Sequence, residues 1–551
     1  MNRKQRIIIS ITGIVLVSLI LIGLTYGYYL TKINGNTNSK SISVVTANLL
    51  LEYADVNDEL ITDSAVEPGK SWTKTFVATN KGNKTLTYGV ALENVVNQFE
   101  RKDDIVYTLD CKQYSKTGFS IDKTNKTVTG TISGTCNGVS EETTFPTIGT
   151  ILVENDIADD KAQVYTLLVT YKETNTDQSV DMNKTFSAKA NIVDPRQFNP
   201  YVNAPLKDVI VASANAATTN SDTTRTALGS TVTEFMSISG ANEHVLNNAP
   251  DDYGTSYYYR GNVTDNYVSF ADKTWRIVRI NGDGTVRLIL DDTAKDSSGT
   301  EIHLTPNDNN FFDNAYIGYM YGTEGSTTYD ATHKNINDST IKQKVDKWYE
   351  DNLKTNYANY LSDTLFCNDK TLASNGIGGV TTQLGYGRNN TYYASTERLM
   401  YSTGTTEIIT AKPTFKCAES ATNDYSRFTV NVTTLSNGNK TNGNLKYPIG
   451  LLSADEVSYA GAYKYNQTNQ SYYLYNSSIT FSWWLSSPIG LDLSYTGEWW
   501  FVRSSSGSID YDYGLYLTDS YTFRPSINLN VSVLVDGGDG TSSNPYTVKI
   551  S

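Results

Sequence analysis

Trp483-Trp484-Leu485-Ser486-Ser487-Pro488, near the C-terminus, is the stretch that first indicates how the second half of the chain folds. A second aromatic run, Trp499-Trp500-Phe501-Val502-Arg503, follows it, and Arg524-Pro525 closes the segment. Large apolar side chains are usually buried, so we expect residues 483–488 and 524–529 to form framework. The residues between these two motifs are therefore the candidates for a ligand-binding surface.

Residues 494–521 have the composition of a binding surface. Tyrosine and tryptophan provide large, stiff contact areas with a polar tip, and serine and glycine provide adaptable hydrogen bonds. Neighbouring residues of a strand point to opposite faces, so we expect one of Trp499 and Trp500 to be exposed. The candidate ligand-binding residues are Tyr495, Trp499, Trp500, Arg503, Asp510, Tyr511, Tyr513, Tyr516, Asp519 and Tyr521.

The composition predicts an extracellular, β-rich protein of several domains. The chain has 551 residues, a net charge of −13 and 40 tyrosines. Phosphate binding needs clustered Lys and Arg, so this acidic balance argues against a nucleic acid partner. Tyrosine and threonine favour strands over helices.

The N-terminus predicts a membrane anchor. Arg3, Lys4 and Arg6 precede an uncharged segment, residues 7–30, which is long enough to cross a bilayer core. Basic residues stay on the cytoplasmic side, so residues 1–6 are expected inside and the bulk of the chain outside the cell. A cleaved signal peptide remains the alternative.

Residues 41–195 alternate apolar and polar side chains, which predicts strands with one buried face each. Turn residues separate these strands, for example Glu67-Pro68-Gly69, so a β-sandwich is expected. Residues 196–250 are then a linker, because the Ala/Thr/Ser/Asn-rich stretch 212–230 has few apolar anchors. Within this linker, residues 205–211 are expected to form one short helix or strand.

Part of this half resembles a known family. Thr46-Ala47-Asn48-Leu49-Leu50-Leu51, then Pro68-Gly69 with Phe76, then Asn80-Lys81-Gly82 are similar to elements of the camelysin/TasA-type biofilm-matrix proteins. The resemblance implies an Ig-like sandwich and self-association by strand addition. Some relatives are labelled metalloproteases, but this chain has no H-E-x-x-H motif, so protease activity is not expected.

Residues 251–551 are expected to form an α+β domain. Trp275-Arg276-Ile277-Val278-Arg279-Ile280 and residues 286–290 flank Asn281-Gly282-Asp283-Gly284, which predicts a β-hairpin with a turn rather than a calcium loop. A helix is predicted from Ile341 to Leu353, capped by Ser339 or Thr340. A second helix begins at the capping box Ser453-Ala454-Asp455-Glu456.

The order of these elements resembles an uncharacterised family of bacterial extracellular domains. That family shows W-R-I/V-V/L, a helix with an aromatic stripe, L-L-S-x-x-E-V, W-W-L-R-S-P and a late R-P; here Ser486 stands where it often has Arg. The family in turn looks like the C-type-lectin or formylglycine-generating-enzyme fold. The resemblance therefore implies a lectin-like domain, and the serine at position 486 is expected to remove a buried ion pair.

The cysteines and histidines predict no metal site. The four cysteines, Cys111, Cys136, Cys367 and Cys417, form two local pairs, so one disulfide per half is expected in an oxidising compartment, with free thiols as the alternative. C-x-x-C spacing is absent from the sequence. The three histidines, His244, His303 and His333, sit in polar stretches and are interpreted as surface residues. No cofactor is expected.

Three functions follow from these observations. The first is a non-catalytic cell-surface protein that binds an unknown glycan or protein through the lectin-like domain, in adhesion or recognition. The second is a matrix- or fibre-forming structural protein. The third is an enzyme of the formylglycine-generating fold, which would need Cys367 and Cys417 as reactive thiols.

Overall fold

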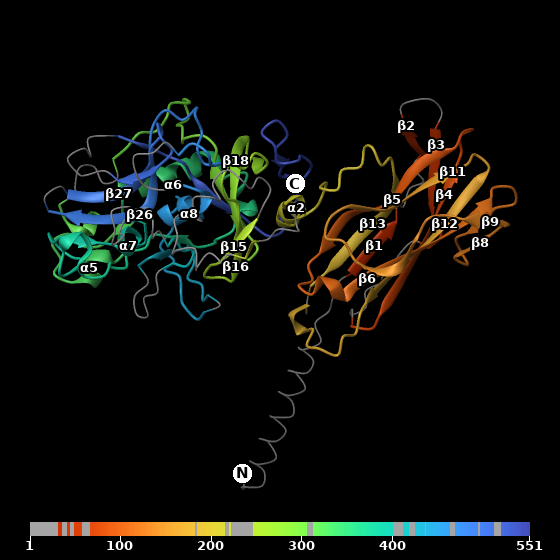
Figure 1. Cartoon of the computed structure of the whole chain (residues 1–551), viewed down its shortest axis with the longest axis horizontal. Coiled ribbons are helices and arrows are strands. Elements are labelled where there is room, and N and C mark those ends of the chain that lie inside the picture. The colour runs from red at the N-terminus through yellow and green to blue at the C-terminus, as the bar shows by residue number, and fades with distance from the viewer. Residues whose placement is uncertain are drawn as a thin grey trace, which may run out of the picture. The chain divides into compact units, whose positions relative to one another are not determined.

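The computed structural model describes residues 31–35, 41–44, 49–57, 67–181, 184–214, 220–221, 246–305, 312–399, 412–417, 425–435, 437–462, 469–493, 496–511 and 520–550. These residues form two compact units, 1–208 and 209–551, that are mostly β-strand with a few short helices (Figure 1). The predicted linker, 196–250, contains the boundary between them. Residues 7–30, the predicted anchor, lie outside the described residues, and no helix in the described part is long and apolar enough to cross a membrane.

The N-terminal unit contains two sheets. The first has the strand order β1 (Thr31–Gly35), β13 (Phe186–Val193), β5 (Leu86–Asn97) and β11 (Thr150–Ile157). The second has the order β10 (Val139–Thr144), β6 (Ile105–Ser115), β12 (Lys161–Tyr171), β4 (Ser71–Asn80), β3 (Leu49–Asp55) and β2 (Ser41–Val44), with β9 (Ile132–Thr135) beside β6. The smaller elements are hairpin β7 (Ser120–Asp122)/β8 (Thr127–Thr129) and the 3₁₀ turns η1 (Lys102–Asp104) and η2 (Ser179–Asp181).

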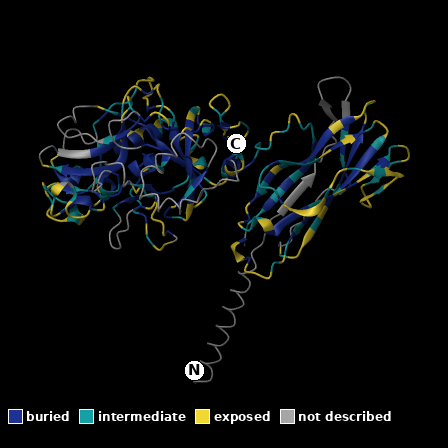
Figure 2. Cartoon of the chain, viewed as in Figure 1, coloured by how far each residue is buried: buried dark blue, intermediate teal, exposed yellow. Residues whose placement is uncertain are grey.

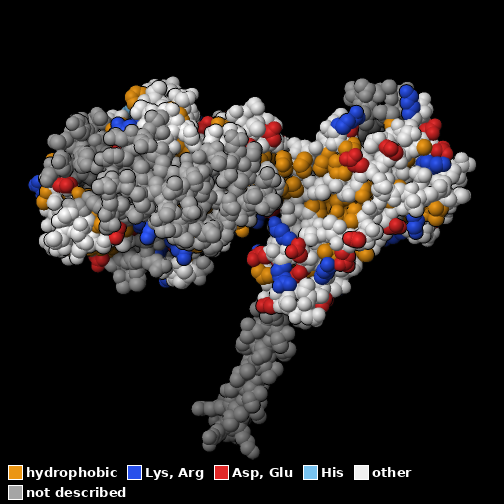
Figure 3. Space-filling view, viewed as in Figure 1, with side chains coloured by type: hydrophobic (Ala, Val, Ile, Leu, Met, Phe, Trp, Pro, Cys, Tyr) orange, Lys and Arg blue, Asp and Glu red, His pale blue; other side chains and the backbone are white. Residues whose placement is uncertain are grey.

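The core of this unit lies between the two sheets. Tyr88 on β5 contacts Tyr165 on β12, and Phe186 on β13 contacts both Trp72 on β4 and Phe145. The predicted period-two burial is confirmed on β13, where every second residue is buried (Figure 2). On the surface, apolar side chains gather over the region of β5 and β13, and both signs of charge are interspersed around them (Figure 3). The Ig-like identity of this unit stays a prediction.

The C-terminal unit contains two larger sheets. One has the order β14 (Asn220–Ser221), β15 (Asn247–Pro250), β16 (Thr255–Tyr258), β18 (Lys273–Ile280), β19 (Val286–Leu290), β30 (Ser526–Leu529) and β25 (Ile449–Gly450), with β17 (Tyr267–Phe270) and β31 (Tyr546–Thr547) attached. The other has the order β23 (Thr391–Tyr392), β26 (Trp483–Asp492), β27 (Thr496–Val502) and β28 (Ile509–Tyr511), with β29 (Thr522–Phe523) beside β26.

Short helices and two-stranded ribbons complete the C-terminal unit. The ribbons are β20 (Met320–Tyr321)/β21 (Asn337–Asp338) and β22 (Phe366–Cys367)/β24 (Arg427–Phe428). The helices are α2 (Leu206–Ser213), which spans the unit boundary, α5 (Tyr329–His333), α6 (Thr340–Asn352), α7 (Ala394–Leu399) and α8 (Ala454–Ala460), with 3₁₀ turns η5 (Asn314–Tyr316), η6 (Ala358–Tyr360) and η7 (Ile377–Gly379). The lectin-like identity of this unit stays a prediction.

Several local predictions for this unit are confirmed. Strands β18 and β19 form the predicted hairpin around Asn281-Gly282-Asp283-Gly284. Ser339 caps α6 by accepting from the Lys342 N–H, and α8 begins with the predicted capping box. Residues 205–211 fall largely in a helix, α2.

A buried ion cluster ties α8 to the β18–β19 hairpin. Glu456 Oε1 accepts from Arg287 Nη1 at 2.6 Å and from Arg279 Nε at 3.2 Å, and its Oε2 accepts from the Ser453 N–H at 3.0 Å. Burial alone raises the pKa of Glu456, but Arg287 and Arg279 outweigh it and lower the pKa below its ordinary value. Both carboxylate oxygens are therefore engaged and the charge is paired, as a buried ion requires.

Candidate functional site

Trp499 and Trp500 are both buried, 3% and 0% exposed, which corrects the prediction that one of them faces solvent. Alternation does place them on opposite faces of β27, but both faces are covered. On one face Trp500 Nε1 donates to Ser395 Oγ of α7 at 3.1 Å. On the other face Phe501, which shares the side of Trp499, contacts Trp484 and Tyr521. A sheet covered on both faces buries consecutive residues.

Three other predicted ligand-binding residues, Arg503, Asp510 and Tyr521, contact neighbouring side chains in the structure. Arg503 and Asp510 are joined in a partly exposed ion pair of 2.7 Å. Tyr521 is half-buried and packs on Trp484. Tyr495, Tyr513, Tyr516 and Asp519 lie outside the described residues, as does the side chain of Tyr511. The ligand-binding role of these residues therefore stays a prediction.

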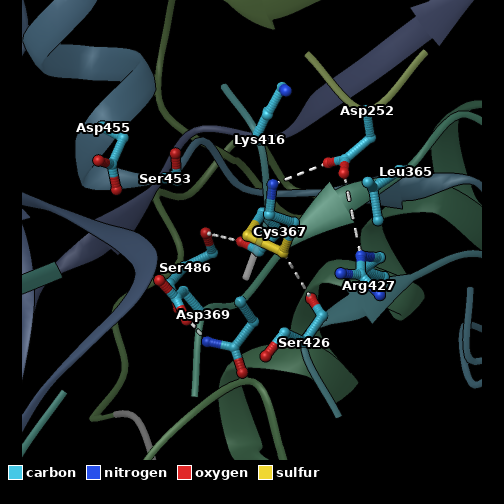
Figure 4. The surroundings of a disulfide bond; sticks show 12 residues. Asp252, Leu365, Cys367, Asp369, Lys416, Ser426, Arg427, Ser453, Asp455 and Ser486 are labelled. Carbon is cyan, nitrogen blue, oxygen red and sulfur yellow. Dashed lines mark hydrogen bonds and ion pairs between the residues drawn. A yellow bond between two sulfur atoms is a disulfide. The ribbon is translucent and has the colours of Figure 1, made fainter. Parts of the chain in front are cut away.

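The framework prediction around residues 483–488 agrees with the structure. Trp483, Trp484 and Leu485 are buried, and Trp484 Nε1 donates to the Leu304 carbonyl. Ser486, which stands where the resembling family often has Arg, is also buried and donates to the Cys367 carbonyl at 2.9 Å (Figure 4). A hydroxyl hydrogen bond thus holds this position without an ion.

Both predicted disulfides are present, Cys111–Cys136 and Cys367–Cys417. Cys417 is buried and its N–H donates to Asp252 Oδ2 at 2.7 Å (Figure 4). Burial raises the pKa of Asp252, against the opposing effects of that N–H and of Arg427. The surroundings of the second disulfide are those of a structural cross-link inside a polar core.

A large polar groove lies elsewhere in the C-terminal unit. Its volume is about 1170 Å³. Its walls come from β17, the start of β18, the segment after β19, α6, and residues 475–478. The aromatic lining residues are Tyr267, Trp348 and Tyr475; the charged ones are Asp272, Lys273, Arg276, Asp291, Asp292, Lys295 and Asp296.

Buried arginines support the floor of this groove. Arg276 stacks on Tyr267, with its guanidinium carbon 3.7 Å from the ring centre, and donates through Nε to Asn266 Oδ1 at 2.7 Å. Asp291 Oδ1 lies 3.9 Å from Arg276 Nη1 and 3.7 Å from Arg524 Nη2. Burial raises the pKa of Asp291, although both arginines act to lower it. Arg524, from the closing Arg-Pro motif, therefore contacts Asp291, which lines the groove.

The rim of the groove contains a turn with unusual backbone angles. Ala271 (φ 54°) and Asp272 (φ 56°) link β17 to β18 as a two-residue turn, and both have left-handed backbone. Such turns favour Asn and Gly, because a Cβ at positive φ is strained. The turn presents Asp272 to solvent at the edge of the groove. Strained backbone often marks functional sites, so this rim is a candidate contact point.

This groove could not be predicted from the sequence. Trp348 lies within the predicted helix 341–353, and Tyr267, Asp272 and Tyr475 belong to segments that are far apart in the sequence. The one available signal was the Phe270-Ala271-Asp272-Lys273 turn before the Trp275 strand. In the described part of the chain, no cluster of three or more His, Cys, Asp or Glu residues is suited to hold a metal ion.

His333 is fully buried, which corrects its interpretation as a surface residue. It ends α5, and its Nε2 donates to the Gly385 carbonyl at 2.8 Å. Its Nδ1 has no hydrogen-bond partner within the residues that the structure describes. The polar sequence around it misled the prediction, because the ring packs against Tyr393 from a distant segment as well as against Tyr329 of its own helix. His303 is half-buried, and His244 lies outside the described residues.

Acidification is expected to destabilise the C-terminal unit through His333. Burial, with the nearby Lys370 charge, lowers the pKa of His333 well below 6.5. Below about pH 6.5 the unfolded chain therefore binds a proton that the folded unit does not, and stability falls by up to about 1.4 kcal/mol for each further pH unit. Urea unfolding at about pH 7 and about pH 5.5 measures this loss. His333→Gln should show a smaller pH dependence; equal slopes would contradict the assignment.

Comparisons with family models, with curated proteins and with solved structures found no match to this chain.

Proposed function

We propose that this chain is a bacterial cell-surface protein whose C-terminal unit binds an extracellular glycan or protein without catalysing a reaction. In this proposal residues 7–30 anchor it in the cell membrane, with the N-terminus inside. The N-terminal unit carries the binding unit away from the membrane as an Ig-like module. The C-terminal unit has the lectin-like role that its resemblance implies.

The observation that carries this proposal is the groove at β17, β18 and α6. It combines half-buried tyrosines, Tyr267 and Tyr475, with carboxylates, amides and hydroxyls along one concave surface. Concave sites with aromatic walls and a few placed polar groups are the usual form of a ligand pocket. Aromatic faces supply contact area, and the polar groups orient hydroxyl or amide groups of a ligand.

The cysteine chemistry favours binding over the enzyme alternative. That alternative needs reactive thiols at Cys367 and Cys417, whereas these two residues form a disulfide. The lining of the groove also contains no histidine and no cysteine. The matrix- or fibre-forming alternative rests on the sequence resemblance and stays a prediction.

The test is binding of the full-length protein to a glycan array, followed by titration of the strongest glycan. Tyr475→Ala is expected to weaken binding at least about tenfold, which corresponds to roughly 1.4 kcal/mol, because it removes an aromatic contact from the groove. Asp272→Ala should also weaken binding, since it removes the carboxylate at the rim.

Two controls separate the groove from other surfaces. Tyr386→Ala removes a partly exposed tyrosine that does not line the groove, and should leave affinity unchanged. The triple variant Tyr511→Ala, Tyr513→Ala, Tyr516→Ala tests the 494–521 segment. Loss of binding in this variant with full binding in Tyr475→Ala would move the site from the groove to that segment.

A further inference from the structure

Lys74 and Asp55 meet in the interior of the N-terminal unit. Lys74 Nζ lies 2.9 Å from Asp55 Oδ1, and the two side chains are 0% and 2% exposed. On β4 the side chains of Lys74, Phe76 and Ala78 point inward together, because they alternate along the strand. Asp55 is the register partner of Phe76, so it lies diagonally across from Lys74 on β3.

Apolar and aromatic groups surround this pair. Lys74 is the register partner of the buried Leu167 on β12. Phe76 stacks between Tyr53 and Tyr165, with ring centres 5.4 Å and 5.3 Å away. Burying two charges in such surroundings carries a desolvation cost that is offset only when every polar atom is satisfied.

Asp55 does not meet that condition as an ion. Its Oδ1 accepts from Lys74 and, at 2.6 Å, from the Tyr53 hydroxyl. Its Oδ2 is buried and has no hydrogen-bond partner within the residues that the structure describes. By contrast, both carboxylate oxygens of the buried Glu456 are engaged. Moving a proton from the Lys74 ammonium to the Asp55 carboxylate would remove both charges and leave an amine beside a carboxylic acid.

We propose that Lys74 and Asp55 react to form an intramolecular amide cross-link between β3 and β4. The lone pair of Nζ attacks Cγ of the neutral Asp55 carboxyl, and the N–C bond forms. A proton passes from Nζ to the departing Oδ2 hydroxyl, the Cγ–Oδ2 bond breaks, and one water molecule leaves. The reaction needs no oxidant, reductant or further co-reactant.

The surrounding geometry favours each part of this step. The two strands hold the amine against the carboxyl, so the reaction has the advantage of an intramolecular, oriented encounter. The Tyr53 hydroxyl donates to Oδ1, where negative charge develops during attack, and this stabilises the tetrahedral intermediate. The Asn57 carbonyl also accepts from Lys74 Nζ and orients it. The product is uncharged and joins two neighbouring strands of one sheet independently of redox conditions, unlike Cys111–Cys136.

The test is mass spectrometry of the full-length protein. After reduction, alkylation and trypsin digestion, we expect residues 41–70 to be joined to residues 71–81, lighter than their sum by one water molecule. Trypsin should fail to cleave after Lys74, because its amine is acylated. Recovery of separate peptides 41–70, 71–74 and 75–81 from the native protein would overturn the proposal.

Variants identify the atoms involved. Lys74→Arg keeps a cation but cannot form the amide. The peptides should then be recovered separately, without the loss of one water molecule, and trypsin should cleave after residue 74. Tyr53→Phe should slow the appearance of the cross-linked peptide; an unchanged rate would remove Tyr53 from the reaction.

The chain contains a matched internal control, Lys342. Its Nζ lies 2.7 Å from Asp346 and 3.2 Å from Asp338, and the lysine side chain is 1% exposed. Unlike Asp55, neither of these carboxylates accepts from a tyrosine hydroxyl within the described residues, so this lysine should stay unlinked and trypsin should cleave after it. Cross-linking at Lys342 as well would show that burial beside a carboxylate is sufficient, and would overturn the role given to Tyr53.

Discussion

Glu456→Gln is expected to destabilise the C-terminal unit by about 3–5 kcal/mol, the cost of leaving a buried charge without its partner. The carboxylate accepts from Arg279 and Arg287, both buried, and is itself 4% exposed. Arg279 keeps Asp251 at 2.9 Å, so Arg287 is the buried cation that loses its carboxylate. Glutamine keeps the volume and can still accept from the Ser453 N–H at the start of α8, so the loss reports the charge and not the helix cap.

Urea unfolding of the full-length protein, followed by tryptophan fluorescence, measures this loss. The matched control is Asp351→Asn, which removes an exposed carboxylate that accepts from the exposed Lys347. Exposed pairs contribute little, so this variant should unfold near the wild-type midpoint. Equal midpoints for Glu456→Gln and the wild type would show that Arg279 and Arg287 are satisfied without Glu456.

Removing the Cys367–Cys417 disulfide is expected to destabilise the same unit by about 4 kcal/mol in the chain-entropy description. The bond closes a loop with a sequence separation of 50 residues, and the unfolded chain gains the freedom of that loop when the bond is absent. The double variant Cys367→Ala, Cys417→Ala avoids a free thiol. Its thermal unfolding should show a lower midpoint for the C-terminal unit.

The second disulfide provides the control for this experiment. Cys111→Ala with Cys136→Ala opens a loop with a separation of 25 residues in the other unit. It should lower the midpoint of the N-terminal unit and leave that of the C-terminal unit in place. A single shared transition that moves equally in both double variants would contradict independent unfolding of the two units.

Local features were predictable because their causes lie within a few residues. The β18–β19 hairpin follows from turn residues between two apolar strands, and the starts of α6 and α8 follow from Ser339 and Ser453 with Glu456. The disulfides were also predictable, since only two local cysteine pairs exist in the sequence. None of these inferences requires knowledge of what packs on top of an element.

Burial was predicted less well wherever it depends on distant segments. His333 sits in a polar stretch, yet Tyr393 and Gly385 enclose it. Trp499 and Trp500 alternate as expected, yet α7 covers one face of their sheet. The composition of a short window cannot reveal these partners, because they come from other parts of the chain.

The sequence alone was sufficient for the mostly β character of the chain, for its turns and helix starts, and for its cysteine pairing, because each depends on local conformational preference or on residue type. The tertiary structure was needed to bury both tryptophans of β27, to assemble the groove beside Arg276, and to bring Lys74 against Asp55. These depend on the register of strands and on which segments cover a face. Contacts between distant residues form only when the chain is folded, so no pattern in a single stretch encodes them by itself.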